Sequence, residues 1–263
     1  YAGMRKVHLA GGYFYLNNKP YYQRLVLDQG YYPDGIWTAP TDEALKKDIE
    51  MSKAVGFNGA RLHQKSFEER YYYWADKLGY LTWGESASWG LNVNNEEACR
   101  NFISEWAELV ERDRNHPSLV TWTPLNETWS ANNSGVYTRF VQNLYDMTKA
   151  LDGTRPVNDA SGDSHIKTDI WSVHNYERQP DKIIKDFTFE HGKEPYRNMR
   201  GDNWRWLAKY EGQPYMLDEW GGLAYILPEK RHGDNAWGYG GAIDNVEDFY
   251  TILRKEVEAI KAC

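Results

Sequence analysis

Short apolar runs alternate with longer amphipathic segments from residue 21 to the end of the chain, and this alternation constrains the fold more than any other feature. The runs are rich in β-branched and aromatic residues, while the longer segments place their apolar residues at helical spacing. Strands and helices that alternate in this way build parallel βα units. We predict seven strands, at residues 23–27, 57–62, 80–83, 119–123, 156–158, 170–173 and 215–217.

The segments between these strands carry recognisable helix boundaries. Thr41 is expected to open the first helix, and Ser66 with Glu69 fits a capping box at the start of the second. A short helix is predicted at residues 204–210, after a polar loop at 177–198 that is long enough to form a wall of a ligand pocket. The last helix is expected to bury one apolar face, formed by Val246, Phe249, Tyr250, Leu253, Val257 and Ile260.

Residues 1–20 do not follow the alternation. Two short apolar runs flank Gly11 and Gly12, which predicts a β-hairpin. We interpret this hairpin either as a junction that leads from a preceding domain or as a cap on the floor of the main fold. No linker interrupts residues 21–263, so these residues are expected to form one domain.

Two glutamates follow predicted strands. Glu127 comes shortly after the strand at 119–123, and Glu219 comes after the run at 215–217. Because the carboxyl ends of parallel strands meet at one edge, where α/β proteins bind ligands, we expect both carboxylates to face one pocket. An unpaired acid beside a core is costly, which favours a functional role for Glu219. The alternative for Glu127 is a helix cap or a solvated loop acid.

Polar side chains also lie at the ends of other strands or directly after them, namely Asp28, Arg61, His63, Glu85, His174 and Tyr176. Asp28 is expected either to bind a ligand hydroxyl or to cap a turn. His174 is as consistent with a pocket as with a core. We interpret His63 as a core histidine and Glu85 as a structural ion-pair partner of Arg61.

Charge and composition exclude several classes of function. The net charge of −7, without a Lys/Arg cluster, argues against nucleic acid as a partner. No apolar run approaches the roughly 20 residues that cross a bilayer, so no membrane partner is expected, and no signal peptide indicates a compartment. Cys99 and Cys263 support neither a disulfide framework nor a zinc site. Aromatic residues make up 15% of the chain; such rings stack on sugars, but most are expected in the core.

The run from Asp113 to Glu127, with its Trp122 and its terminal Asn126-Glu127, resembles the signature of glycoside hydrolase family 2, which contains β-galactosidases, β-glucuronidases and β-mannosidases. The resemblance extends from about Lys19 over most of the chain. It implies an α/β fold, a (β/α)8 TIM barrel over residues 21–263, as the catalytic domain of a longer enzyme whose other domains are its partners. Seven βα units are visible, so we predict truncation before the eighth strand and an exposed edge between strands one and seven.

The resemblance also assigns roles to residues that match the family's motifs. Glu127 matches the acid/base and Glu219 the nucleophile. Asn126 would hold the 2-hydroxyl of the sugar, Tyr176 would hydrogen-bond the nucleophile, and Arg61 would help to keep the nucleophile ionised. Asp28, His174 and Trp220 complete the expected substrate-binding set.

Two departures from the family pattern affect the sugar site. Arg61-Leu62-His63-Gln64 shifts a histidine by one position, and Ser88-Trp89-Gly90 stands where the family usually has a histidine. These segments contact the terminal sugar in the family, so the resemblance leaves the identity of that sugar open.

The predicted function is a retaining exo-β-glycosidase that hydrolyses a terminal β-linked sugar of the β-galactoside type, without a cofactor or a metal. Retention requires the two carboxyl groups to lie about 5 to 5.5 Å apart. The alternatives are a β-glucuronidase, a β-mannosidase or an endo-glycanase such as a mannanase. Two further alternatives are an inactive carbohydrate-binding barrel and a metal enzyme with the ligand set His63, His174, Asp28 and Glu219.

Overall fold

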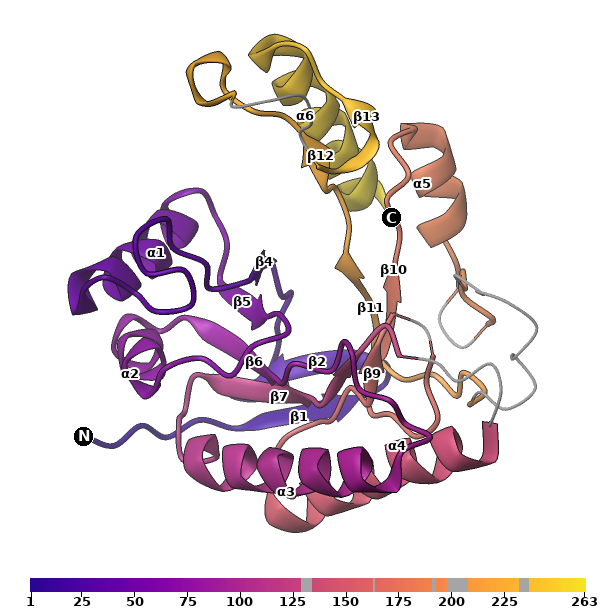
Figure 1. Ribbon diagram of the computed structural model, residues 1–263. Helices are drawn as coiled ribbons and strands as arrows, with labels where there is room; N and C mark the ends of the chain where they lie inside the picture. Colours follow the sequence, from indigo (N-terminus) through magenta and orange to yellow (C-terminus); the bar gives the residue numbers. More distant parts are fainter. Residues whose placement is uncertain (129–133, 163, 191–192, 198–207, 232–236) are drawn as a thin grey trace.

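Four parallel strands form the continuous part of the barrel in the computed structural model, which describes residues 1–128, 134–162, 164–190, 193–197, 208–231 and 237–263 (Figure 1). In spatial order they are β4 (Leu25–Asp28), β5 (Gly59–Leu62), β6 (Leu81–Glu85) and β7 (Leu119–Thr123). The predicted strands match these elements within about two residues, and β7 has the predicted bounds. β7 is buried at every position, as expected of a strand that is covered on both faces.

The remaining barrel strands form two shorter parallel pairs. β8 (Leu125–Asn126) pairs with β9 (Ala160–Ser161), and β10 (Trp171–His174) pairs with β11 (Tyr215–Glu219). The strand predicted at 156–158 is wrong in position: only Val157 forms a parallel bridge, with Trp122, and the strand itself follows two residues later. Among the described residues, no strand pairs with the outer edges of β4 and β11.

Helices α1 (Asp42–Ala54), α2 (Glu69–Leu78), α3 (Glu96–Asp113) and α4 (Ser134–Leu151) follow the first barrel strands. Thr41 caps α1 as predicted, because its hydroxyl accepts the amide hydrogen of Ala44. The predicted capping box of α2 is wrong: Glu68 is the N-cap residue and makes no capping hydrogen bond, since its carboxylate binds Arg70. None of the helices in the described residues is both long enough and apolar enough to cross a bilayer.

The N-terminal hairpin covers the floor of the barrel. It consists of β1 (Val7–Ala10), β2 (Tyr13–Leu16) and β3 (Lys19–Pro20), which pair in antiparallel order. Its buried side chains Val7 and Phe14 share one apolar cluster with Leu81, Val120 and Ile170, which lie at the beginnings of barrel strands. Of the two interpretations of residues 1–20, this packing fits a cap on the barrel floor.

The C-terminal region differs from the prediction in two places. The stretch 177–198 is not only a loop, because it contains α5 (Pro180–Phe187), which begins at a proline and buries Ile183 and Phe187. Residues 204–207 of the predicted short helix lie outside the described residues, and residues 208–210 are irregular. β12 (Leu223–Ala224) and β13 (Tyr239–Ala242) then pair with each other, with the short helix η2 (Pro228–Lys230) between them.

The last helix, α6 (Val246–Ala262), packs against α5 with only part of the predicted face, since Ile260 joins the same apolar cluster as Ile183 and Phe187 of α5. Its fully buried residues are Glu256 and Ala259, whereas Tyr250 and Val257 of the predicted apolar face are exposed. Helical spacing therefore located the helix correctly and identified its buried face only in part.

Candidate active site

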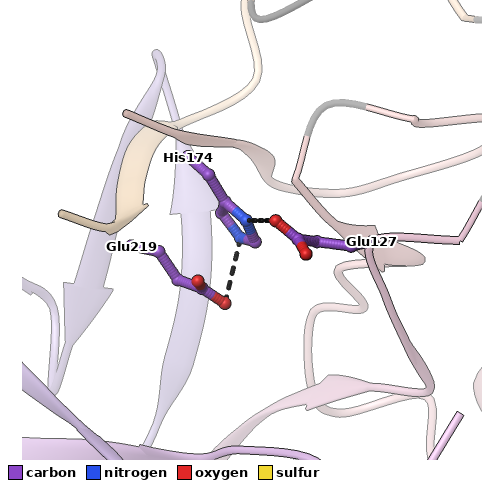
Figure 2. A group of neighbouring side chains, drawn as sticks. All are labelled: Glu127, His174 and Glu219. Carbon is purple, nitrogen blue, oxygen red and sulfur yellow. Dashed lines mark hydrogen bonds and ion pairs between the residues drawn. The ribbon is translucent and has the colours of Figure 1, made fainter. Parts of the chain in front are cut away.

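The two glutamates lie at the same end of the barrel. Glu219 is the last residue of β11, and Glu127 follows β8, where its amide donates to the carbonyl oxygen of Ser161 at 2.8 Å. One carboxylate oxygen of each glutamate and one ring nitrogen of His174, the last residue of β10, lie within 4.8 Å of one another. Figure 2 shows the His174 ring between the two carboxylates. The carboxyl ends of three barrel strands thus converge on one point, as in other barrels.

Glu127 has an unusual backbone conformation. Its φ is 45°, in the left-handed region that residues other than glycine seldom adopt. Gln64, after β5, shares this feature with a φ of 54°, and its amide donates to a carboxylate oxygen of Glu85 at 3.0 Å. Strained backbone of this kind is concentrated at functional sites, so these values add to the case for a site at this end of the barrel.

Arg61 and Tyr176 hold the Glu219 carboxylate. Arg61 Nη2 lies 2.9 Å from Glu219 Oε1, and the Tyr176 hydroxyl donates to Oε2. Burial and the charge of Glu219 raise the pKa of Tyr176, so the phenol stays a hydrogen-bond donor. Burial alone would lower the pKa of Arg61, but its carboxylate neighbours, Glu85 first among them, raise it above the ordinary value.

Arg61 also binds the residues around Glu219. Its Nε donates to Glu85 Oε2 at 2.8 Å, which is the ion pair predicted from the sequence. Its Nη2 donates to Asn126 Oδ1 at 2.6 Å and to His63 Nδ1 at 2.8 Å. His63 is buried, as a core histidine would be, but it lies 3.8 Å from Glu219 Oε1 and so belongs to the site.

Asn126 offers a hydrogen-bond donor that the protein does not use. Its backbone amide donates to Ser88 Oγ at 3.0 Å, and its side-chain oxygen accepts from Arg61. Its Nδ2 is buried and has no hydrogen-bond partner among the described residues. A buried unpaired donor is costly unless a ligand completes it.

Asp28 ends β4, and Trp220 directly follows β11. Asp28 caps a turn: its carboxylate accepts from the Gly30 amide at 2.8 Å and from the Tyr71 hydroxyl at 3.1 Å, and burial raises its pKa. This geometry favours the turn-capping alternative for Asp28. Trp220 is partly buried directly after Glu219.

Sequence reasoning missed Ser161 and gave no role to Asp218. Ser161 Oγ donates to Asp218 Oδ2 at 2.6 Å and lies 2.8 Å from His174 Nε2. Asp218 was visible in the sequence beside Glu219, whereas Ser161 carries no signal of its own because β9 is only two residues long. Tyr239 of β13 was also missed, and it stacks on Tyr176 with ring centroids 3.5 Å apart.

A cavity of about 530 Å³ lies beside His174 and Tyr176, two of the residues that contact the Glu219 carboxylate. It is lined by His174, Asn175, Tyr176, Glu177, Arg178, Gln179, Asp186, Tyr196 and Gly240. Five of these residues belong to the stretch 177–198, so that stretch forms a wall of this cavity. Arg178 links this stretch to β13, because its guanidinium donates to the carbonyl oxygens of Gly240 at 3.0 Å and Gly241 at 3.1 Å.

The metal ligand set proposed as an alternative does not converge. Asp28 is engaged with Gly30 and Tyr71, and His63 Nδ1 accepts from Arg61. Within the described residues, Glu127, His174 and Glu219 form a different group with metal-like spacing. The Arg61 guanidinium, 2.9 Å from Glu219 Oε1, opposes a second cation at that oxygen.

Comparison with known proteins places this arrangement in a family. The family model for glycosyl hydrolases family 2, TIM barrel domain, matches residues 7–221. A β-galactosidase of Lactococcus lactis is 29% identical over 168 residues, which is 61% of this chain and 16% of that protein. A β-glucuronidase of Mus musculus is 28% identical over 232 residues, which is 83% of this chain and 34% of that protein.

Solved structures agree in fold over the whole chain. A β-D-glucuronidase from Dictyoglomus thermophilum has a TM-score of 0.74 at 20% identity, and the match covers 100% of this chain and 45% of that one. A family 2 β-galacturonidase from Eisenbergiella tayi bound to galacturonate has a TM-score of 0.74 at 18% identity, with 100% and 45% covered. The chain thus spans less than half the length of these relatives. The family match over residues 7–221 and the barrel geometry lead to one conclusion: the chain belongs to glycosyl hydrolases family 2 and contains the TIM barrel domain of that family.

Proposed function

We propose that this chain is the catalytic barrel of a retaining exo-β-glycosidase, in which Glu219 is the nucleophile and Glu127 the acid/base. The observation that carries the proposal is the separation of the two acids, since one carboxylate oxygen of each lies within 4.8 Å of the other. Retaining glycosidases hold their carboxyl groups about 5 to 5.5 Å apart, whereas inverting enzymes need roughly 6.5 to 9.5 Å to admit a water molecule.

The surroundings of Glu219 suit a nucleophile. Arg61 and Tyr176 both contact its carboxylate, and both interactions stabilise the ionised form. Glu219 attacks the anomeric carbon while Glu127 passes a proton to the leaving oxygen. Glu127 then takes a proton from the water that hydrolyses the glycosyl ester on Glu219.

Asn126 and the residues near the strand ends form the proposed sugar site. The buried Nδ2 of Asn126 supports its role as donor to the 2-hydroxyl, because a sugar oxygen would complete its hydrogen bonding. His174 and Trp220 are proposed as further contacts of the terminal sugar, whereas Asp28 is assigned to the turn that it caps. The cavity of about 530 Å³ beside His174 and Tyr176 supports a pocket, which suits an exo-acting enzyme.

Residues 21–263 are proposed to act as one domain of a longer enzyme, with residues 1–20 both covering the barrel floor and forming the junction to the domain before it. The relatives support this arrangement, because the chain covers only 16% of the Lactococcus lactis β-galactosidase and 34% of the mouse β-glucuronidase. We propose a β-galactoside as substrate, in line with the name of the bacterial relatives. A β-glucuronide is the second candidate, because the mouse β-glucuronidase matches 83% of the chain.

The first experiment is a panel of nitrophenyl β-glycosides offered to the full-length protein. Turnover of the galactoside with retained configuration, followed by proton NMR of the released sugar, is the expected result. If the protein prefers the glucuronide or the mannoside, the proposed substrate changes to that sugar. Cleavage inside polysaccharides would favour the endo-glycanase, and galactose binding without turnover would favour the inactive barrel.

The second experiment separates the roles of the two acids. Glu219→Ala is expected to abolish turnover of every substrate, because no covalent intermediate can form. Glu127→Ala is expected to keep its turnover of substrates with good leaving groups, which need no proton. Added azide should restore part of the lost activity, with a β-glycosyl azide as the product. Small and equal losses in both variants would reject these roles. Glu108→Ala, on the exposed side of α3, is the control.

A further inference from the structure

His174 contacts both glutamates at once (Figure 2). Its Nδ1 lies 2.7 Å from Glu127 Oε1, and its Nε2 lies 3.3 Å from Glu219 Oε1. Nε2 is also 2.8 Å from Ser161 Oγ. The ring is 1% exposed, so bulk water has little access to these contacts. The imidazole therefore forms a direct connection between the two proposed catalytic acids.

The Ser161 hydroxyl determines which ring nitrogen carries a hydrogen. Ser161 Oγ donates its own hydrogen to Asp218 Oδ2 at 2.6 Å, so toward His174 the oxygen acts as an acceptor. His174 Nε2 must then be the donor. One further proton occupies the 2.7 Å contact between Nδ1 and Glu127 Oε1, either as carboxylic acid with neutral imidazole or as carboxylate with imidazolium.

We propose that His174 is a positioning residue that forms a proton-holding pair with Glu127 and retains the proton that Glu127 passes to the leaving oxygen. The proposal rests on the proposed function of Glu127 as the acid/base. In the first step the proton leaves the pair as the glycosidic C–O bond breaks and Glu219 bonds to the anomeric carbon. In the second step a water oxygen replaces Glu219 on that carbon, and the water proton returns to the pair.

The charges around the ring favour retention of this proton. Carboxylates reach the imidazole from two sides: Glu127 after β8, and Asp218 at 3.4 Å with Glu219 at 3.3 Å on β11. Arg61 on β5 offsets part of the β11 charge. A proton shared by two groups is lost in a step that belongs to the pair. Without the imidazole, Glu127 should therefore lose its proton at a lower pH.

The test is the pH dependence of kcat/KM for His174→Asn in the full-length protein, with aryl glycosides of graded leaving-group ability. Asparagine keeps a donor for Glu127 but cannot hold the proton. The basic limb is expected to move down by about one pH unit. At pH 7 the loss should reach about tenfold with poor leaving groups and stay small with dinitrophenolate. His8→Asn, a histidine substitution in β1, should change neither.

An unmoved basic limb, or equal losses with good and poor leaving groups, would overturn the proposal. A second measurement does not depend on turnover: NMR titration of the His174 ring, assigned by its absence in His174→Asn. Glu127→Gln removes the carboxylate that shares the proton and is expected to lower the midpoint of the His174 titration. An unmoved midpoint overturns the pair. A lowered midpoint in a protein that hydrolyses no glycoside overturns the proposed function alone and leaves the pair intact.

Discussion

At the scale of single residues, Arg61 organises the site, because one guanidinium reaches Glu85, Asn126, His63 and Glu219. Its planar fork of donors makes this possible, and a lysine could satisfy few of these acceptors together. Removing it would leave buried acids without their cation, which is strongly destabilising. The side chain thus serves both the folded state and the placement of the Glu219 carboxylate.

Tyr176→Phe tests the second group that holds Glu219. The variant loses one hydrogen bond to the carboxylate and keeps the ring that stacks on Tyr239. We expect kcat/KM to fall roughly 10- to 100-fold, with little change in the urea midpoint of unfolding. Tyr145→Phe is the matched control, because Tyr145 lies on α4, away from the site, and the variant likewise loses one tyrosine hydrogen bond to a carboxylate, that of Asp169. Similar kcat/KM values for the two variants would contradict the role of Tyr176.

The left-handed backbone of Glu127 predicts an order of stability. At a φ of 45° glycine is free of the strain that alanine suffers, so Glu127→Gly is expected to be more stable than Glu127→Ala by about 1 kcal/mol in urea unfolding. On α3 the order should reverse, with Glu108→Ala more stable than Glu108→Gly by about 1 kcal/mol. Finding alanine more stable at both positions would show that Glu127 is unstrained.

The sequence alone placed individual residues well wherever a strand led straight to them. Glu127, Glu219, Arg61 and His174 were located at strand ends because their strands are apolar and bounded by polar residues. Ser161 could not be found in this way, since its relevance depends on the partners that it meets in space, Asp218 and His174. The roles assigned to these residues stay predictions until variants are measured.

At the scale of elements, the sequence predicted the long runs and failed on the short ones. β7 was predicted with its observed bounds because Pro117 and Pro124 delimit an uninterrupted apolar run. β9 was misplaced because two residues form no periodic pattern, and only pairing with β8 makes them a strand. α5 was missed because it is eight residues long, and most of its positions are polar or partly exposed. Tertiary context decides such elements.

Helix α6 carries a testable pH dependence. Glu256 is buried there, its Oε2 has no hydrogen-bond partner among the described residues, and burial raises its pKa from 4.5 to about 7. Between these two pKa values the folded state holds a proton that the unfolded state has released. The free energy of unfolding is therefore highest below the unfolded pKa and falls as the pH rises through 7. Glu256→Gln should exceed the parent by about 2 kcal/mol at pH 8 and differ little at pH 5.

The measurement is urea unfolding at both pH values. Glu258→Gln, an exposed neighbour on the same helix, provides the control and should show no pH-dependent gain. If Glu256→Gln behaves like Glu258→Gln at pH 8, Glu256 is ionised in the folded state without cost.

At the scale of the whole molecule, the barrel has an open border. β4 pairs only with β5, and β11 pairs only with β10, within the part of the chain that the structure describes. Open strand edges invite pairing with other chains. Residues 1–263 alone are therefore expected to self-associate, and Leu27→Lys, a charge on β4, should reduce this association in size-exclusion chromatography with light scattering.

Val55→Lys is the matched control for this prediction, because Val55 is an exposed apolar residue at the end of α1 and not on a strand edge. Equal effects of the two substitutions would mean that general surface hydrophobicity, and not the edge of β4, drives the association.

Glu219, the proposed nucleophile, lies on the border strand β11, which lacks a neighbour on one side within the described residues. A displacement of about 1 Å in a reacting group can cost a hundredfold in rate, far more than it costs in folding free energy. A polypeptide segment that pairs with this edge of β11 would thus fix the position of Glu219 as well as complete the barrel wall. The rate of turnover, and not the melting temperature, would then respond most strongly to how well that segment fits against β11.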